Sequence, residues 1–133
     1  MRPVRHPVLS PFCRELTTIT QAEVDGAEGF PAVFARFLEW IGDREALFSS
    51  WGEYDMRQFQ RDCRQHAVAY PFARHWNLKR AVARQLGRKP AGMGTLLAEL
   101  GLALEGTQHR GLDDARNITR IVRAVLGAEL GTL

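Results

Sequence analysis

The sequence predicts a helix-rich α/β fold, and two observations support this. Apolar residues recur at helical spacing in three segments, 31–42, 77–86 and 112–125. Two shorter segments, 46–51 and 69–72, have the apolar character of strands, and a helical pattern follows each of them. Strands that alternate with helices are typical of α/β proteins, whose ligands bind beyond the carboxyl ends of the strands.

The composition is that of an ordinary globular protein. The chain has 133 residues, of which 45% are apolar and 25% are charged, so we expect a single domain over residues 1–133. The net charge of +3 permits nucleic-acid binding but does not argue for it. No apolar run is long enough to span a membrane, so no membrane partner is expected. Two isolated cysteines and the lack of an apolar signal core predict a cytoplasmic protein.

Capping signals divide the first half of the chain into elements. Residues 10–16 could form a short helix after a proline-rich start, and Thr20 with Glu23 forms a capping box for a helix that ends near Gly26. The helix that begins at Pro31 ends at Gly42.

In the second half, the segment 46–51 is a strand candidate, and a helix begins near Asp55. Residues 69–72 are the second strand candidate. Helices are then expected from Asn77 to Leu86 and from Gly94 or Thr95 to Gly101. The last helix is expected to present one apolar face, formed by Leu112, Ala115, Ile118, Ile121, Val122 and Val125.

The candidate functional residues precede and open this last helix. Asp113 and Asp114 fall in or just before its first turn, where the helix dipole favours ionised carboxylates that suit a metal ligand. His109 lies on the loop leading in and could reach the same place. Taken alone, an ordinary acidic helix start is the commoner explanation.

The whole string from His109 to Ile118, His-x-Gly-Leu-Asp-Asp-Ala-x-Asn-Ile, resembles the third motif of the DEDDh 3′-to-5′ exonucleases. The nearest branch is similar to the histone-mRNA 3′-exonuclease and the bacterial KapD-type proteins. The resemblance implies a ribonuclease-H-like exonuclease fold, with His109 as general base and Asp114 as metal ligand.

The string Trp51-Gly52-Glu53-Tyr54-Asp55 resembles the second motif of the same family, which implies that Asp55 is a metal-site carboxylate. A lone aspartate at this place is more often a helix cap. Tyr54 could stack on a terminal base, or it could be a half-buried aromatic beside the cleft. Arg110 could contact phosphate, although a solvated helix face is the commoner place for such an arginine.

The first motif of the family, an Asp-x-Glu on the first strand, is missing where it belongs. Asp43 and Glu45 have this spacing, but a strand of about six residues, roughly 20 Å long, separates them from Asp55. We therefore interpret them as solvated charges. The chain resembles the family from about Arg2 to Leu126 but lacks its first strands. It is then a fragment or has a late start site, is completed by a partner copy, or is a remnant that no longer cleaves, and we favour the first.

The resemblance implies a 3′-5′ exonuclease that acts on RNA or single-stranded DNA 3′ ends with two Mg²⁺ or Mn²⁺ ions. With half of the carboxylates absent, we expect the chain to be nearly inactive alone. The expected completing part is a missing N-terminal segment or a second copy in a homodimer. The alternatives are a non-catalytic nucleic-acid-binding or protein-interaction module of the same ancestry, and an unrelated helical scaffold.

Overall fold

A computed structural model describes the backbone of residues 1–130 and the side chains of residues 1–127. The chain forms two compact units, one from residues 1–46 and 59–71, and the other from residues 47–58 and from residue 72 onward. The expectation of one domain over residues 1–133 stays a prediction, and its last three residues lie outside those described. In the described part, no helix is long and apolar enough to cross a membrane.

The first unit is helical: it holds α1 (Pro11–Thr17), α2 (Gln21–Asp25), α3 (Phe30–Ile41) and most of α4 (Tyr54–Gln65). The predicted capping box is present, because the Thr20 hydroxyl accepts from the Glu23 N–H and the Glu23 carboxylate accepts from the Thr20 N–H. Gly42 ends α3 at a positive φ of 57°, a conformation that glycine adopts without steric cost. The predicted helix boundaries of this unit are therefore confirmed to within a residue or two.

Aromatic rings from α3 and α4 build the core of the first unit. The rings of Phe34 and Phe59 meet edge to face at 5.9 Å, and Tyr70 meets Phe59 in the same way at 5.5 Å. Edge-to-face pairs of this kind add to the stabilisation that burial provides. The prediction of a strand over residues 69–72 is wrong, because Tyr70 packs in this aromatic core and Pro71 has no N–H with which to join a ladder.

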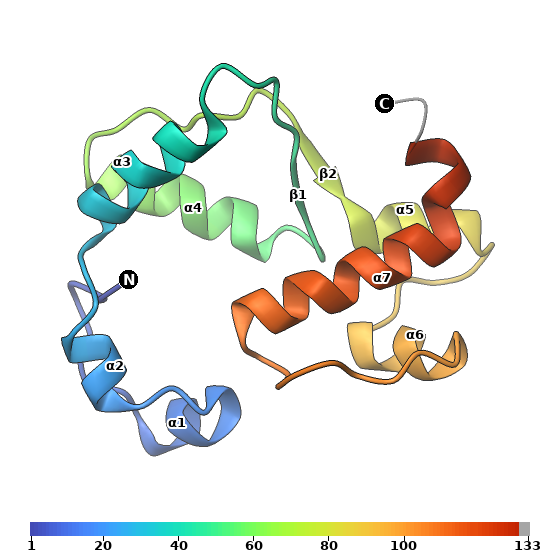
Figure 1. Cartoon of the computed structure of the whole chain (residues 1–133), viewed down its shortest axis with the longest axis horizontal. Helices are drawn as coiled ribbons and strands as arrows, with labels where there is room; N and C mark the ends of the chain where they lie inside the picture. The colour runs from blue at the N-terminus through green and yellow to red at the C-terminus, as the bar shows by residue number, and fades with distance from the viewer. Residues whose placement is uncertain (131–133) are drawn as a thin grey trace. The chain divides into compact units, whose positions relative to one another are not determined.

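The second unit begins with β1 (Phe48–Ser50), which pairs in parallel with β2 (His75–Asn77) so that Ser50 is opposite Asn77. The two strands lie side by side in Figure 1. β1 is shorter than the predicted strand 46–51, and β2 lies later than the predicted 69–72. β2 runs directly into α5 (Leu78–Gln85), because the Asn77 side chain caps that helix by accepting from the Arg80 N–H at 3.1 Å.

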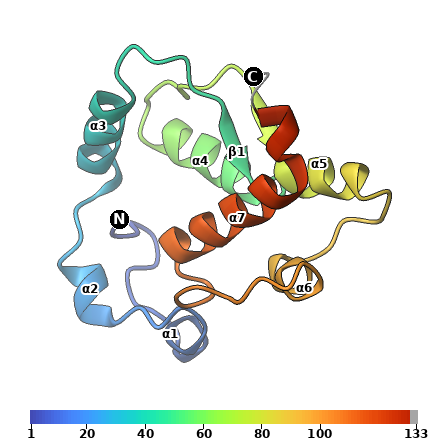
Figure 2. The ribbon, with the colours of Figure 1, turned by 45° about the vertical axis from the view of Figure 1, so that its right-hand side comes forward.

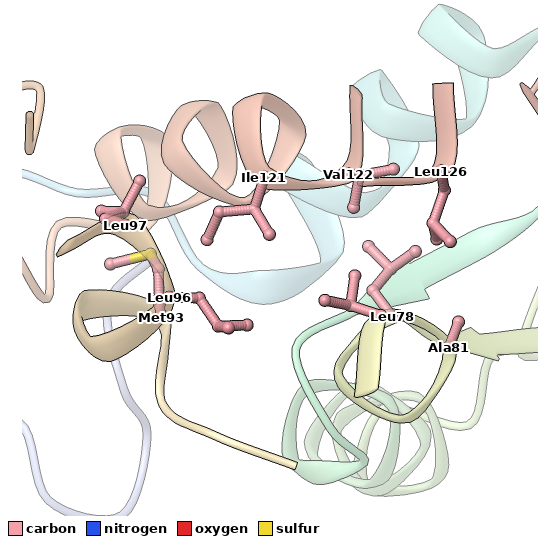
Figure 3. Packing of buried hydrophobic residues seen from close by; sticks show 9 residues of the cluster. Leu78, Ala81, Met93, Leu96, Leu97, Ile121, Val122 and Leu126 are labelled. Carbon is pink, nitrogen blue, oxygen red and sulfur yellow. The ribbon is translucent and has the colours of Figure 1, made fainter. Parts of the chain in front are cut away.

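α5 packs against the strand pair, and three helices enclose the second core. α5 and α6 (Met93–Glu99) both contact α7 (Gly111–Leu130), and Figure 2 shows α7 running past them. α6 begins at Met93, one or two residues before the predicted start. Figure 3 shows side chains from the three helices pointing toward one another; the cluster consists of Leu78, Ala81, Val82, Met93, Leu96, Leu97, Ile121, Val122 and Leu126.

Two residues of the predicted apolar face of α7, Leu112 and Ala115, are exposed. Leu112 is 65% exposed, whereas Ile121 is fully buried. At 3.6 residues per turn, Leu112 lies about 2.5 turns before Ile121 and thus on the opposite side of the helix. Asp114 lies about two turns before Ile121, so its side chain leaves the helix on the buried side.

Candidate active site

Segments that are far apart in sequence form one pocket within the second unit. The pocket has a volume of about 580 Å³, and Asp55, His109 and Asp114 are among the residues that line it. Asp55 comes from the first turn of α4, His109 from the loop before α7, and Asp114 from the first turn of α7. Apolar side chains line much of the remaining wall; they are Phe48, Trp51, Leu78, Met93 and Ile118. The structure therefore brings the three residues of the predicted site to one place.

The turn that carries Asp55 is tied to its surroundings on two sides. The buried Ser50 hydroxyl lies 2.8 Å from Nε2 of His75 on β2 and donates to the Gly52 carbonyl at 3.1 Å. The indole N–H of Trp51 donates to the Ala91 carbonyl at 3.3 Å. Asp55, in the first turn of α4, therefore follows a turn that the side chains of Ser50 and Trp51 hold in place.

Ion pairs hold the same turn on its outer side. The Glu53 carboxylate pairs with Arg57 at 2.6 Å, one turn along α4, and with Arg80 of α5 at 3.5 Å. Both arginines are mostly exposed, so each pair stabilises the fold only weakly. Their main effect is to connect the start of α4 with α5 beside the pocket.

His109 and Asp114 are joined by a backbone hydrogen bond. The His109 N–H donates to Oδ1 of Asp114 at 3.1 Å, and the His109 backbone has a positive φ of 66°. A positive φ is uncommon for a residue with a side chain and persists where other contacts hold it. Asp114 thus places the backbone of His109 as well as a carboxylate at the pocket.

Asp113 has a different role from its neighbour. Its Oδ2 accepts from the Thr107 N–H at 2.9 Å, its Oδ1 lies 3.5 Å from Arg116, and a Cβ added at Gly106 would collide with its carboxyl group. Asp113 is not among the residues that line the pocket, whereas Asp114 is. This geometry agrees with the choice of Asp114 as the candidate ligand.

The motifs predict no role for Asn117, a buried polar residue of α7 with 0% exposure. Its amide bonds both the N–H and the carbonyl of Glu105, at 3.1 and 2.8 Å, and the carbonyl of Asp113 at 2.8 Å. The sequence does contain a signal for this role: Asn117 lies one turn before Ile121, on the face that the apolar pattern predicts to be buried, and a buried amide needs hydrogen-bond partners.

The two predicted substrate contacts lie beside the pocket and are not among the residues that line it. Tyr54, the first residue of α4, is 77% exposed, and Arg110 is half-buried just before α7. Their roles stay predictions. Asp43 and Glu45 are exposed in the segment between α3 and β1, as their interpretation as solvated charges requires.

The carboxylates at the pocket have the chemistry of a Mg²⁺ or Mn²⁺ site, because these hard cations prefer oxygen ligands. Among residues 1–127, no three His, Cys, Asp or Glu side chains are grouped closely enough to hold an ion together. By the chemistry of their donor atoms, the carboxylates of Asp55 and Asp114 and the imidazole of His109, which line the pocket, fit one part of a two-metal site.

The fold and the pocket define a helix-rich α/β protein with an acidic, histidine-containing site. The chain belongs to the exonuclease family of the RNase T type, whose family model, described as "Exonuclease", matches residues 1–122. The membership confirms the resemblance to the DEDDh exonucleases that the third motif indicated.

Curated relatives agree with this assignment. The chain is 34% identical to the 3′-5′ exoribonuclease 1 of Rattus norvegicus over 98% of its own length, and 33% identical to the ERI1 exoribonuclease 2 of Mus musculus over 88%. It spans 41% of the first relative and 20% of the second.

Solved structures confirm the fold. The nuclease domain of 3′hExo, a DEDDh family member bound to rAMP, superposes with a TM-score of 0.85 at 31% identity, over 96% of this chain and 69% of that one. A 3′-exonuclease described in 3′-end-specific recognition of the histone mRNA stem-loop superposes with a TM-score of 0.86 at 29% identity, over 96% of this chain and 61% of that one. The predicted fold class, a helix-rich exonuclease fold with few strands, is therefore confirmed.

Proposed function

We propose that this chain is the part of a 3′-5′ exonuclease that supplies His109 as general base and Asp55 and Asp114 as ligands for two Mg²⁺ or Mn²⁺ ions. The supporting observation is that Asp55 lines the same pocket as His109 and Asp114, although it lies far from them in the sequence. RNA is the preferred substrate in this proposal over single-stranded DNA, because the relatives are named as exoribonucleases and one is described bound to rAMP.

In this proposal the imidazole of His109 takes the proton of the attacking water, the task of a general base. Asp114 keeps His109 next to the carboxylates through its bond to the His109 N–H. Divalent ions bound there would stabilise the attacking and leaving oxygens of the phosphodiester. Tyr54 stacks on the terminal base and Arg110 pairs with a phosphate oxygen, as nucleic-acid ends are commonly held.

We propose that a segment outside this chain completes both the ligand set and the strand pair. β1 and β2 form a sheet of two strands in the described chain, and the edge of such a sheet accepts a further strand. The completing strand comes from an N-terminal segment that carries an Asp-x-Glu, or from a second copy of the chain. A cytoplasmic location stays part of this proposal.

The proposal is tested by trimming of 3′-labelled single-stranded RNA and DNA oligonucleotides in Mg²⁺. We expect residues 1–133 alone to trim weakly and the product of the whole gene to trim well. His109→Ala in that product should slow trimming roughly 100-fold or more, the usual contribution of a general base. The matched control is His6→Ala, which changes an exposed histidine of the first unit. Equal trimming by the wild type and the His109→Ala variant would contradict the proposal.

A second candidate is a non-catalytic nucleic-acid-binding module of the same ancestry. The observation that favours it is that no three potential ligands are grouped among residues 1–127. This candidate predicts that the product of the whole gene binds oligonucleotides with an affinity that falls as salt rises, and does not shorten them.

A further inference from the structure

We infer that Asn117 is a positioning residue, which fixes the loop that carries His109 relative to Asp114. The importance of this loop for catalysis rests on the proposed function, but the inference about how the loop is held does not. Figure 1 shows the loop running from α6 back to the N-terminal end of α7. The loop residues from Ala103 to His109 are exposed, so apolar packing does little to hold them.

Side chains of α7 hold this loop by bonding its backbone. Asn117 bonds both backbone groups of Glu105, Asp113 accepts from the Thr107 N–H, and Asp114 accepts from the His109 N–H. Every second residue of the stretch 105–109 is therefore attached to the helix. The last of the attached residues is His109, the proposed base.

Asn117 differs from the other attachments in its burial. Its exposure is 0%, whereas Asp113 and Asp114 are half-buried. Water competes little for a buried hydrogen bond, and a buried polar group left without a partner is costly. Arg120 supports the same arrangement, because it donates to Oδ1 of Asn117 at 3.1 Å and to the Ala103 carbonyl at 2.6 Å. Asn117 is thus the most firmly held of the side chains that attach the loop to α7.

Position 117 requires a side chain with one acceptor and two donated bonds, which a planar amide provides. Nδ2 of Asn117 donates to two carbonyl oxygens, those of Glu105 and Asp113, each at 2.8 Å. An ionised carboxylate of the same shape would place an oxygen against both carbonyl oxygens. Asn117→Asp therefore keeps the volume and an oxygen that can accept from the Glu105 N–H, but it replaces both donated bonds with repulsion between oxygens. It should therefore loosen the attachment, except at low pH, where a protonated carboxyl can donate to one of the two carbonyls.

The sign of this pH effect follows from which form of the introduced carboxyl can donate. The two carbonyl oxygens disfavour its charged form, whereas the Arg120 guanidinium and the Glu105 N–H favour it, so all four groups set its pKa. Loop attachment in the Asn117→Asp variant should then be present at acid pH and lost as the pH rises through that pKa. The wild-type amide does not titrate, and its attachment should not change over the same range.

Amide hydrogen exchange measured by NMR, expressed as protection relative to the intrinsic rate at each pH, tests the inference. In Asn117→Asp we expect protection at the amides of Glu105 and His109 to fall at least tenfold at neutral pH and to recover toward acid pH. The core amides of Leu97 and Val122 should keep their protection. The matched control is Asn77→Asp, because the cap bond of Asn77 uses only its oxygen and should survive the same substitution.

Asn117→Ser provides a second variant if Asn117→Asp fails to fold. A serine hydroxyl on α7 can bond a carbonyl one turn earlier in its own helix but is too short to replace both bonds to Glu105. The expected result is again loss of loop protection with core protection kept. Loop protection that persists in both variants would overturn the inference, and so would an equal loss at loop and core amides, which indicates only a structural role.

Whether the fixed loop matters for catalysis is tested by trimming with the product of the whole gene. Asn117→Ser should lower kcat for trimming, because the variant misplaces the proposed base. It should change KM less, because only one of the two proposed substrate contacts, Arg110, is next to this loop. A rise in KM with unchanged kcat would overturn this step. If the wild type does not trim at all, the proposed function fails, whereas the exchange experiment still decides whether Asn117 holds the loop.

Discussion

The backbone N–H of His109 donates to Oδ1 of Asp114 at 3.1 Å, so the two residues that the third motif singles out are bonded to one another in the fold. The carboxylate of Asp114 therefore has two properties that substitutions can separate. Its oxygen accepts a hydrogen bond that places the loop, and its charge makes the pocket suitable for a cation.

Substitution of Asp114 should separate these two properties. Asp114→Asn keeps an oxygen that can accept from the His109 N–H, so the loop should stay attached while the charge is lost. Asp114→Ala should lose both, and the lost hydrogen bond should cost about 1 kcal/mol of local stability. Amide exchange at His109 measures the first property, and the line broadening that Mn²⁺ causes at pocket residues measures the second.

We expect normal His109 protection with weak Mn²⁺ broadening in Asp114→Asn, and loss of both in Asp114→Ala. Asp113→Asn is the matched control for the charge, because Asp113 does not line the pocket and its oxygen would still accept from Thr107. Equal loss of Mn²⁺ broadening in Asp113→Asn and Asp114→Asn would contradict the assignment of Asp114 as the ligand.

Gly106→Ala should disturb the same loop for a steric reason. Gly106 has a positive φ of 71°, and an added Cβ would overlap the Asp113 carboxyl group. Gly101→Ala is the matched control, because Gly101 has a similar φ of 67° and no atom lies within 4 Å of its added Cβ. The control should cost the conformational penalty alone, about 1 kcal/mol. Gly106→Ala should cost more than this, and it should also abolish the protection of the Thr107 amide in hydrogen exchange. Equal losses in unfolding free energy would contradict the steric argument.

The helices could be predicted from the sequence because their signals are local. The capping box of Thr20 and Glu23 and the glycine at position 42 fix helix ends through contacts between near neighbours. The second strand could not be placed, because its position depends on distant partners. Tyr70 is drawn into the aromatic core of α3 and α4, and the more polar segment His75–Asn77 pairs with β1 instead.

The site was predictable to the extent that its chemistry is carried by motifs. Asp55, His109 and Asp114 follow from two motif strings, and the structure places all three at one pocket. Asn117 carries no reactive group, and its partner Glu105 lies twelve residues away. Its role depends on loop geometry that hydrophobic periodicity does not describe. Hydrophobic periodicity also predicts a buried Leu112, which the helix geometry places on the exposed side of α7.

Ser50→Ala should weaken the turn before Asp55. The Ser50 hydroxyl has one proton, which it donates to the Gly52 carbonyl, so Nε2 of His75 must be the donor in the contact at 2.8 Å. The nitrogen chemical shifts of neutral His75 should show the tautomer protonated at Nε2. Ser50→Ala removes both bonds in a buried place and should lower the free energy of unfolding by about 1–3 kcal/mol. Ser49→Ala, on the neighbouring half-buried residue that also lines the pocket, should cost less. An equal cost for the two serines, or a His75 protonated at Nδ1, would contradict this account.

The aromatic core of the first unit makes a prediction about thiol reactivity. Cys63 is buried among Phe30, Phe34 and Phe59, and burial raises the pKa of its thiol above the ordinary value, with the Asp62 carboxylate adding to the rise. Because the thiolate is the reactive form, a thiol reagent should modify Cys63 far more slowly than the half-buried Cys13 at neutral pH.

Phe59→Ala opens the core and should lower the free energy of unfolding by about 3 kcal/mol. Mass spectrometry of the labelled peptides should then show faster modification at Cys63 and an unchanged rate at Cys13. The matched control is Phe12→Ala, which removes an exposed ring and should leave Cys63 slow. A Cys63 that reacts as fast as Cys13 in the wild type would mean that the aromatic cluster does not exclude reagent.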